Sequence, residues 1–164
     1  MPVRNWQVYG PGVTLPAPQP NAQALASLGG LLSVTIDVPP AISDALTAAG
    51  EALPVPTSTT ALIDTGATLT SVDEPILKGL GLNPIDKVKS GTAAGQAEQW
   101  VYMARLSFPQ LGWTIDLPVA GVDLAGVVSS TTPPEPIGAL LGRNLLGLGV
   151  LVWNGPGGTY TLAW

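Results

Sequence analysis

The clearest candidate for chemistry in this 164-residue chain is Asp64, in the stretch ALIDTGATLTS that runs from residue 61 to residue 71. Three apolar residues precede Asp64, as at the end of a buried strand, and Thr65 and Gly66 follow it, as in a turn. Such a strand would carry the carboxylate to the turn, where the Thr65 hydroxyl can hydrogen-bond and Gly66 lets a ligand or another backbone approach. The alternative is an aspartate that only ends a strand and has no catalytic task.

The residue types that are missing limit the chemistry further. The chain has no His and no Cys, which excludes a Ser-His-Asp triad, a Cys-His pair, a disulfide, and metal sites built on imidazole or thiolate. Any reaction must therefore rest on carboxylates, and we expect neither a metal nor another cofactor. A glycosidase would need a second carboxylate in the same chain, and no other Asp or Glu stands at a comparable strand end.

Charge and hydropathy exclude two classes of partner. The net charge is −5, and the six Lys and Arg residues are scattered singly, so no basic stripe could bind nucleic acid. The apolar stretch from residue 137 to residue 153 is short for a membrane span and contains Arg143 and Asn144. We interpret it as a buried turn, helix and strand. The first twelve residues lack the apolar run of a signal peptide, so a cytoplasmic location is the default.

The elements that must position the candidate carboxylate are mainly strands. The chain holds 20 Gly and 17 Pro, and several segments alternate apolar and polar residues with the period of a half-buried strand. Residues 31–38 show this alternation most clearly, and residues 113–119 repeat it, with Pro118 suggesting an edge position. Residues 99–108 are apolar on both faces, as in a central strand, and residues 150–164 predict a hairpin with its aromatic residues on one side.

Short helices are expected between the strands. Three are predicted, over residues 41–53, 71–82 and 143–149. The second would begin with a capping box from Ser71 to Glu74. The chain has about the length of one domain, and we divide it into an N-terminal extension over residues 1–30 and a domain over residues 31–164, which contains a long insertion at residues 39–60.

A second stretch to consider beside ALIDTGATLTS is IGALLGRNLL, from residue 137 to residue 146, in which two apolar residues and a Gly precede a helix that starts with Arg143 and Asn144. Together the two motifs resemble the active-site loop and the second hallmark of the retropepsin-like aspartic proteases. The hairpin predicted within residues 88–108 stands where that family has its flap, and residues 150–164 are similar to the C-terminal hairpin of bacterial single-domain members. The resemblance covers Leu31 to Trp164.

The resemblance implies an all-β, or mainly β, fold: the closed β-barrel of the acid proteases, with short helices and one lobe in each chain. It also implies a homodimer, because each chain carries one Asp-Thr-Gly and the reaction needs two carboxylates around one water. One carboxylate would act as general base, while the other keeps a proton for the scissile carbonyl. The implied activity is that of an aspartic endopeptidase acting on peptides or proteins, with a broad preference for large apolar side chains at the cleaved bond.

The same resemblance assigns roles to individual residues. Asp64 would be the catalytic acid, Thr65 would brace the two loops of the dimer, and Gly66 would line the cleft. Substrate binding would fall to the residue after the motif, to the tip of the flap and to the segment beneath the loop: Ala67; Thr92, Ala93, Ala94 and Gly95; Leu140, Leu141 and Gly142. Arg143 and Asn144 would support the loop.

One position departs from the family pattern. Viral members often carry a carboxylate directly after the Asp-Thr-Gly-Ala stretch, where it pairs with the arginine of the second motif, whereas this chain has Thr68 there. Arg143 must therefore pair with another acid, such as Asp73, Glu74 or Asp116, or with a backbone carbonyl. A chain of this fold that binds peptides or dimerises without cleaving would have the same sequence features, so catalysis and silent binding both stay open.

Overall fold

Strands separated by short helices make up most of the chain. The computed structural model describes residues 3–8, 21–92, 95–131 and 133–164. The strands are β1 (Val3–Gln7), β2 (Leu31–Asp37), β3 (Thr57–Ile63), β4 (Ser71–Asp73), β5 (Pro84–Thr92), β6 (Gly95–Phe108), β7 (Trp113–Val122), β8 (Ile137–Leu141), β9 (Val150–Asn154) and β10 (Thr159–Ala163). The helices are α1 (Ala22–Leu28), α2 (Pro40–Ala48), α3 (Glu74–Gly79) and α4 (Arg143–Leu146).

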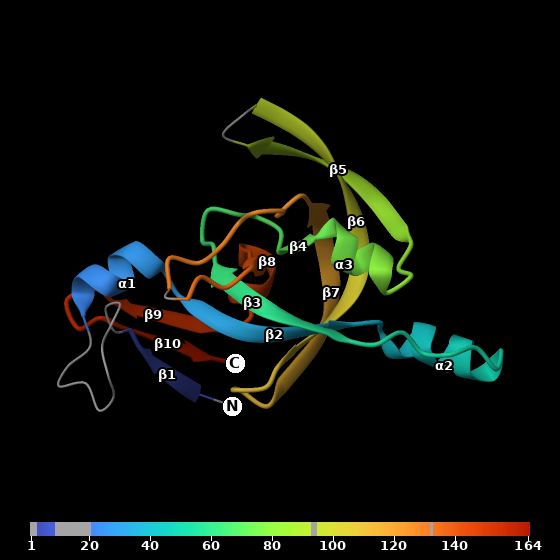
Figure 1. Cartoon of the computed structure of the whole chain (residues 1–164), viewed down its shortest axis with the longest axis horizontal. Coiled ribbons are helices and arrows are strands. Elements are labelled where there is room, and N and C mark those ends of the chain that lie inside the picture. Colours follow the sequence, from blue (N-terminus) through green and yellow to red (C-terminus); the bar gives the residue numbers. More distant parts are fainter. Residues whose placement is uncertain (1–2, 9–20, 93–94, 132) are drawn as a thin grey trace.

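Six of these strands close into a barrel (Figure 1). One sheet has the strand order β2-β3-β8-β4-β7-β6-β5, and β2 also pairs with β6 over residues 35–37, which closes the ring and leaves β5 outside it. The β3–β8 and β4–β7 pairs are parallel, and the other pairs of this sheet are antiparallel. The predicted mainly β fold, a closed barrel with short helices, is confirmed.

The barrel interior holds the apolar residues that alternate along its strands. In β2, Leu32, Val34 and Ile36 are buried, as the alternation in residues 31–38 predicts. The last part of β6 is buried on the same principle, at Ala104, Leu106 and Phe108. Because β6 pairs with β2, β5 and β7, its predicted central position is also confirmed.

The prediction that Pro118 marks an edge position is confirmed locally, although β7 as a whole is not an edge strand of the sheet. β7 lies between β4 and β6, but β4 reaches only residues 120–122 of β7. Pro118 pairs with Met103 of β6 on one side, and on the other side its carbonyl accepts a hydrogen bond from the Asn144 side chain. Within the described parts of the chain, no strand pairs with β7 on that side at Pro118, so the missing N–H of proline removes no hydrogen bond of the ladder.

The helices lie close to their predicted places but differ at their starts. α2, α3 and α4 fall within or beside the predicted ranges. The predicted capping box is wrong, because Ser71 is a buried residue of β4 that pairs with Leu140 and Ala120, and α3 begins only at Glu74. Strand pairing has overridden the local helix signal. α1 was not predicted, although the Asn21 side chain caps it by accepting hydrogen bonds from its first turn.

The C-terminal hairpin joins the first strand of the chain in a second, three-stranded sheet of order β1-β10-β9. The predicted hairpin is confirmed, with Tyr160 and Leu162 buried and Trp164 stacked on Trp113 at a centroid separation of 4.6 Å. β1 pairs with β10 from Val3 to Gln7. Part of the predicted N-terminal extension therefore lies in one sheet with the end of the chain.

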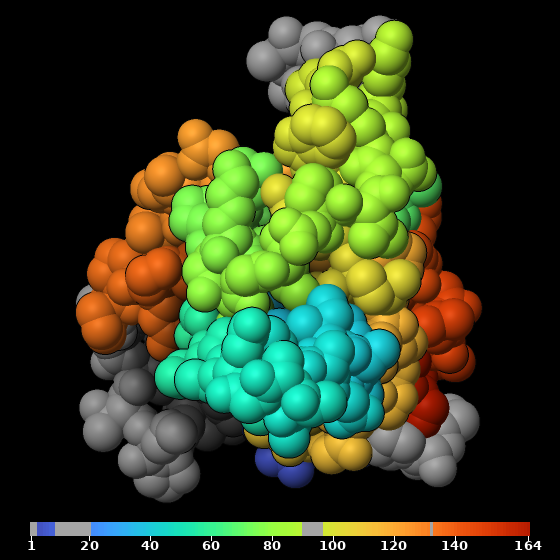
Figure 2. Space-filling model, turned by 90° about the vertical axis from the view of Figure 1, so that its right-hand side faces the viewer, coloured from blue at the N-terminus to red at the C-terminus, as the bar shows by residue number. Residues whose placement is uncertain are grey.

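Two segments project from the barrel (Figures 1 and 2). One contains α2 and lies within the predicted insertion at residues 39–60; the other is the β5–β6 hairpin, whose tip bends in Figure 1 toward the side that carries the β3–β4 loop. In the described parts of the chain, no helix is long and apolar enough to cross a membrane.

Candidate active site

Asp64 is the first residue after β3 and is held by its own turn. Its backbone N–H donates to the Leu141 carbonyl of β8 at 3.0 Å. Its Oδ1 accepts hydrogen bonds from the backbone N–H groups of Gly66 at 2.9 Å and Ala67 at 3.2 Å. Among the described residues, none donates a hydrogen bond to Oδ2 of this half-buried side chain. One carboxylate oxygen is thus fixed by the backbone, and the other remains available to a water or a substrate.

The Arg143 side chain clamps the loop that follows Asp64. Its Nη1 donates to the carbonyls of Thr65 at 2.7 Å and Gly66 at 2.9 Å, and its Nη2 donates to the Thr68 hydroxyl at 2.8 Å. The sequence left open whether Arg143 pairs with an acid or with a backbone carbonyl. In the structure it binds two backbone carbonyls. Thr68 is a partner as well, although it replaces the carboxylate of the viral pattern.

The acids that were considered for Arg143 have other partners. Asp73 accepts a hydrogen bond from the Leu124 N–H, and Asp116 forms a bidentate pair with Arg105. Glu74 accepts from the Tyr102 hydroxyl and pairs with Lys78, and these two contacts, Lys78 first, hold the pKa of Glu74 below its usual value. The arginine is therefore satisfied by the loop itself, so that it fixes the loop's curvature without a charged partner.

Asn144 connects the end of the loop to strand β7 of the barrel. Its Oδ1 accepts from the Thr70 N–H at 2.7 Å and the Thr70 hydroxyl at 2.8 Å, while its Nδ2 donates to the Pro118 carbonyl at 3.0 Å. Thr70 is fully buried, and its Oγ1 in turn accepts from the Gly142 N–H at 3.1 Å. The Asn144 amide and the Thr70 hydroxyl are both hydrogen-bonded, which offsets the cost of removing Thr70 from water and orders the end of the loop.

Sequence reasoning missed Thr70. The signal available was a hydroxyl residue at the far end of the loop, just before the strand that begins at Ser71. Nothing local distinguishes it from Thr68, because its role comes from Asn144, 74 residues further along the chain.

Gly142 must be glycine because the loop crosses it at close range. A Cβ on Gly142 would lie 2.5 Å from the Leu69 carbonyl carbon and 2.6 Å from the Thr70 nitrogen. Leu141 is fully buried in the core, whereas Leu140 is half-buried and pairs with Leu62 of β3. Leu141 and Gly142 thus support the loop from beneath, and Leu141 leaves no side-chain surface for a substrate.

Comparison with known proteins agrees with this geometry. The family model described as aspartyl protease matches residues 48–145 of the chain, a range that contains both the Asp64 loop and the Gly142–Asn144 support. The chain belongs to the aspartyl protease family. It is also similar to the solution structure of the simian foamy virus (mac) protease, at 20% sequence identity over 72% of this chain and 92% of that one, with a TM-score of 0.42. No curated protein matches the chain.

The predicted flap of this aspartyl protease is only partly described. Thr92 and Gly95 pair with each other at the end of the β5–β6 hairpin, and Ala93 and Ala94 lie outside the described residues. The hairpin projects from the barrel (Figure 1). Its closure over a substrate stays a prediction.

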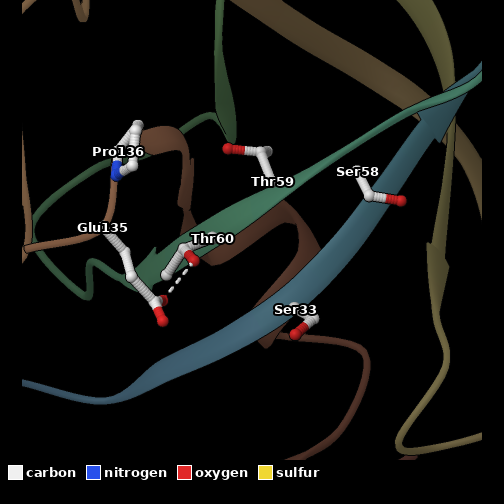
Figure 3. A pocket seen from close by; sticks show the side chains of 6 residues that line it. All are labelled: Ser33, Ser58, Thr59, Thr60, Glu135 and Pro136. Atoms are coloured by element: carbon white, nitrogen blue, oxygen red, sulfur yellow. Dashed lines mark hydrogen bonds between the residues drawn. The ribbon is translucent and has the colours of Figure 1, made fainter. Parts of the chain in front are cut away.

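A polar hollow of about 450 Å³ lies on the β2–β3 side of the barrel, and Asp64 is not among its lining residues (Figure 3). Ser33, Ser58, Thr59 and Thr60 line it together with Glu135 and Pro136. Its single carboxylate, Glu135, accepts a hydrogen bond from the Thr60 hydroxyl at 2.9 Å. Hydrolysis by carboxylates needs a pair of acids, so we do not assign catalysis to this hollow. In the described residues, no group of His, Cys, Asp and Glu could hold a metal ion.

Proposed function

We propose that this aspartyl protease acts as a homodimeric endopeptidase, in which the Asp64 side chains of two chains hydrolyse a peptide bond. The observation that carries the proposal is the loop of residues 64–70, which fixes Oδ1 of one carboxylate and leaves Oδ2 without a donor among the described residues. Each chain has a single Asp-Thr-Gly. The second carboxylate of the reaction therefore has to come from a second chain.

The paired carboxyl groups would hold one proton between them, because two like charges a few ångströms apart cannot both form cheaply. The ionised Asp64 takes a proton from the bound water, whose oxygen attacks the scissile carbonyl carbon, and the protonated Asp64 gives its proton to the carbonyl oxygen. When the tetrahedral intermediate collapses, one hydroxyl of the intermediate gives its proton to the ionised carboxylate, the carbon–nitrogen bond breaks, and the leaving nitrogen takes the proton of the other carboxyl group, so that the pair again holds one proton. Activity should decline at the pH at which both carboxyl groups ionise.

The neighbouring residues would bind and orient the substrate. Thr65 and Gly66 are exposed at the start of the loop, where Thr65 can brace the partner's loop and Gly66 can line the cleft. Ala67 and Leu140, both half-buried, offer apolar surface, and the tip of the β5–β6 hairpin would close over the peptide backbone. Because one apolar pocket contributes about 1.5–3 kcal/mol at most, the preference for large apolar side chains should be broad.

The experiment that tests this proposal compares Asp64→Asn with a matched substitution. Asp123→Asn is the control, because Asp123 also accepts a hydrogen bond from the backbone two residues further on, at 2.9 Å from the Ala125 nitrogen, but lies outside the loop. With an unfolded protein such as casein as substrate, from acidic to neutral pH, wild type and Asp123→Asn should cleave. Asp64→Asn should lose activity by orders of magnitude and remain folded.

Two results would contradict the proposal. Undiminished cleavage by pure, folded Asp64→Asn would place catalysis elsewhere. A folded wild-type dimer that binds peptides and never cleaves them would instead support the catalytically silent alternative.

A further inference from the structure

The segment that projects between β2 and β3, residues 39–56, is called the arm below (Figures 1 and 2). It consists of α2, which leads away from the barrel, and an extended segment that returns to β3. None of the nine residues of α2 is buried, and Ile42 is the one residue of this helix that packs against the core. Almost the whole surface of the arm is therefore open to another molecule.

Hydrogen bonds within the arm hold it in one shape. The hydroxyls of Ser43 and Thr47 donate to carbonyls of the preceding turn, at 2.9 and 2.8 Å. After the helix, Gly50 has a φ of 71°, which favours glycine, and the Glu51 N–H donates back to the Leu46 carbonyl at 2.9 Å. The arm is thus ordered without a partner, which lowers the entropy that it would lose on binding one.

The return segment of the arm presents apolar side chains to water. Leu53 is 53% exposed, and Val55 is 83% exposed, the largest fraction among the exposed large apolar residues of the described chain. Pro54 and Pro56 alternate with them, and each proline fixes its own φ. An apolar surface that is held in one shape and left in water indicates a contact with another molecule.

The charges of the arm are all negative. Asp44 and Glu51 are exposed, and residues 39–56 contain no Lys or Arg. Within the described parts of the chain, neither carboxylate forms an ion pair or accepts a hydrogen bond, whereas Asp116 on the barrel is paired with Arg105. Charge complementarity therefore favours a partner that carries Lys or Arg beside apolar residues, and it disfavours a second copy of the arm.

One strand joins the arm to the catalytic loop. β3 begins at Thr57, directly after the arm, and Asp64 directly follows its last residue. The seven residues of β3 span about 23 Å in an extended strand. Figure 2 shows the arm, α3 and the β5–β6 hairpin one above another on the same face. A polypeptide bound at Asp64 can therefore reach the arm with about 7–12 extended residues.

We infer that the arm is a docking site for the protein substrate, and that it binds a segment of apolar and basic residues about 7–12 residues away from the cleaved bond. The inference rests on the proposed function. The apolar side chains of this segment cover Leu53 and Val55, and its basic side chains pair with Asp44 and Glu51. Because the contact lies far from the reacting atoms, it holds substrate and transition state equally, so it lowers KM and leaves kcat unchanged.

The first test compares one cleavable peptide with and without tails, each attached in turn to its amino and its carboxyl end. One tail is a Leu/Lys segment on a flexible linker of about 12 residues, which is long enough to span the distance. It should lower KM about 10-fold without a change in kcat. A Leu/Glu segment on the same linker, and the Leu/Lys segment on a linker of about 3 residues, should leave KM unchanged.

Matched substitutions test whether the effect arises at the arm. Leu53→Ser with Val55→Ser should abolish the advantage of the Leu/Lys tail and keep KM and kcat for the untailed peptide. Val3→Ser, at a 60% exposed valine of β1, is the control that should keep the advantage. Asp44→Lys should remove most of the advantage, whereas Asp123→Lys, at an exposed acid outside the arm that changes the net charge equally, should keep it.

Three results would overturn the docking site. The first is an equal KM for wild type with tailed and untailed peptides. The second is an advantage of the Leu/Lys tail that survives Leu53→Ser with Val55→Ser. The third is that these two substitutions change only the sedimentation of the protein, because the arm would then contact a second copy of the chain.

The untailed peptide separates the docking site from the proposed peptidase. If wild type cleaves it and the tails have no effect, only the docking site is wrong. If wild type cleaves no peptide, fluorescence anisotropy of a labelled Leu/Lys segment with the folded protein still tests the arm. Binding that is lost with Leu53→Ser and Val55→Ser would keep the docking site and count against the peptidase, and no binding would contradict both.

Discussion

The β5–β6 hairpin and the β9–β10 hairpin are built in opposite ways. In the β5–β6 hairpin, Lys87 pairs with Glu98 and lies 5.0 Å from the centre of the Trp100 ring, which is itself 46% exposed. In the β9–β10 hairpin, Tyr160 is buried, Trp164 stacks on Trp113, and the open strand has no charge. The first hairpin is suited to remain in water, and the second is suited to be covered.

This difference also separates two tasks of the proposed peptidase. A projecting hairpin with charged edges can move over a substrate without pairing to other proteins. An anchored hairpin with an uncharged edge can instead hold two chains in a fixed relation. The following substitutions test whether the two hairpins contribute to stability and to catalysis as unequally as their contacts indicate.

The largest expected effect is on the free energy of unfolding. It is tested by replacing one tryptophan in each hairpin region and comparing the two losses. Trp164 stacks on Trp113 and on Phe108, at 4.6 and 5.8 Å between centroids, so Trp164→Ala should lower the free energy of unfolding by about 3 kcal/mol. Trp100→Ala should cost less than about 1 kcal/mol, because its side chain is exposed. Urea denaturation measures both, and equal losses would remove the distinction between the hairpins.

The second prediction concerns the clamp that leads into the β9–β10 hairpin. Lysine cannot reproduce the fork by which Arg143 reaches two carbonyls and a hydroxyl, so Arg143→Lys should reduce kcat by about 10- to 100-fold through misplacement of the loop. Arg105→Lys is the control, because Arg105 also binds bidentately, to Asp116, at a site outside the loop. If both substitutions reduce kcat alike, the clamp has no special role.

The smallest effect is expected at Tyr102 of β6, which anchors the root of the projecting hairpin to α3. Its hydroxyl donates to Glu74 at 2.8 Å, so Tyr102→Phe should cost about 1 kcal/mol at neutral pH. Because the folded-state pKa of Glu74 is lowered, its contribution is present above the unfolded value of about 4.5 and is lost as pH falls through the folded value. The difference between wild type and Tyr102→Phe should therefore shrink in acid.

At alkaline pH the contact between Tyr102 and Glu74 should affect the free energy of unfolding a second time, through the tyrosine. Burial first, and then the hydrogen bond to Glu74, raise the pKa of Tyr102 to about 12 from a usual value of 10.0. The contribution of the protonated tyrosine is present below pH 10 and is lost as pH rises toward 12. Denaturation curves of wild type and Tyr102→Phe, recorded from acid to alkaline pH, measure the difference between their free energies of unfolding. If that difference is the same at acid, neutral and alkaline pH, the Tyr102–Glu74 contact has no energetic role.

Sequence alone predicted the parts of the fold that have a local cause. The alternation in residues 31–38 follows from the barrel wall that β2 forms, and the Asp64 loop follows from residues that are adjacent in the chain. The parts that were missed have distant causes. Ser71 was assigned to a helix cap although β4 forms against Leu140 and Ala120, and β1 has no signal apart from its partner β10 at the other end of the chain.

The candidate site shows the same division. Arg143 and Asn144 were predicted as supports of the loop, but their partners depend on how the loop curves, which no local pattern encodes. The Thr70 hydroxyl gains its role only because Gly142 lacks a side chain, so that the loop backbone can pass 2.5–2.6 Å from the place a Cβ would take. A short motif can therefore point to the candidate catalytic residue, while the contacts that hold it in place require the folded chain.

The most direct test of the two-chain mechanism measures peptidase activity and sedimentation together over a dilution series. If each chain supplies one Asp64, activity per chain should fall as the dimer dissociates, and the active species should sediment as a dimer throughout. Constant activity per chain in a species that sediments as a monomer would contradict the account.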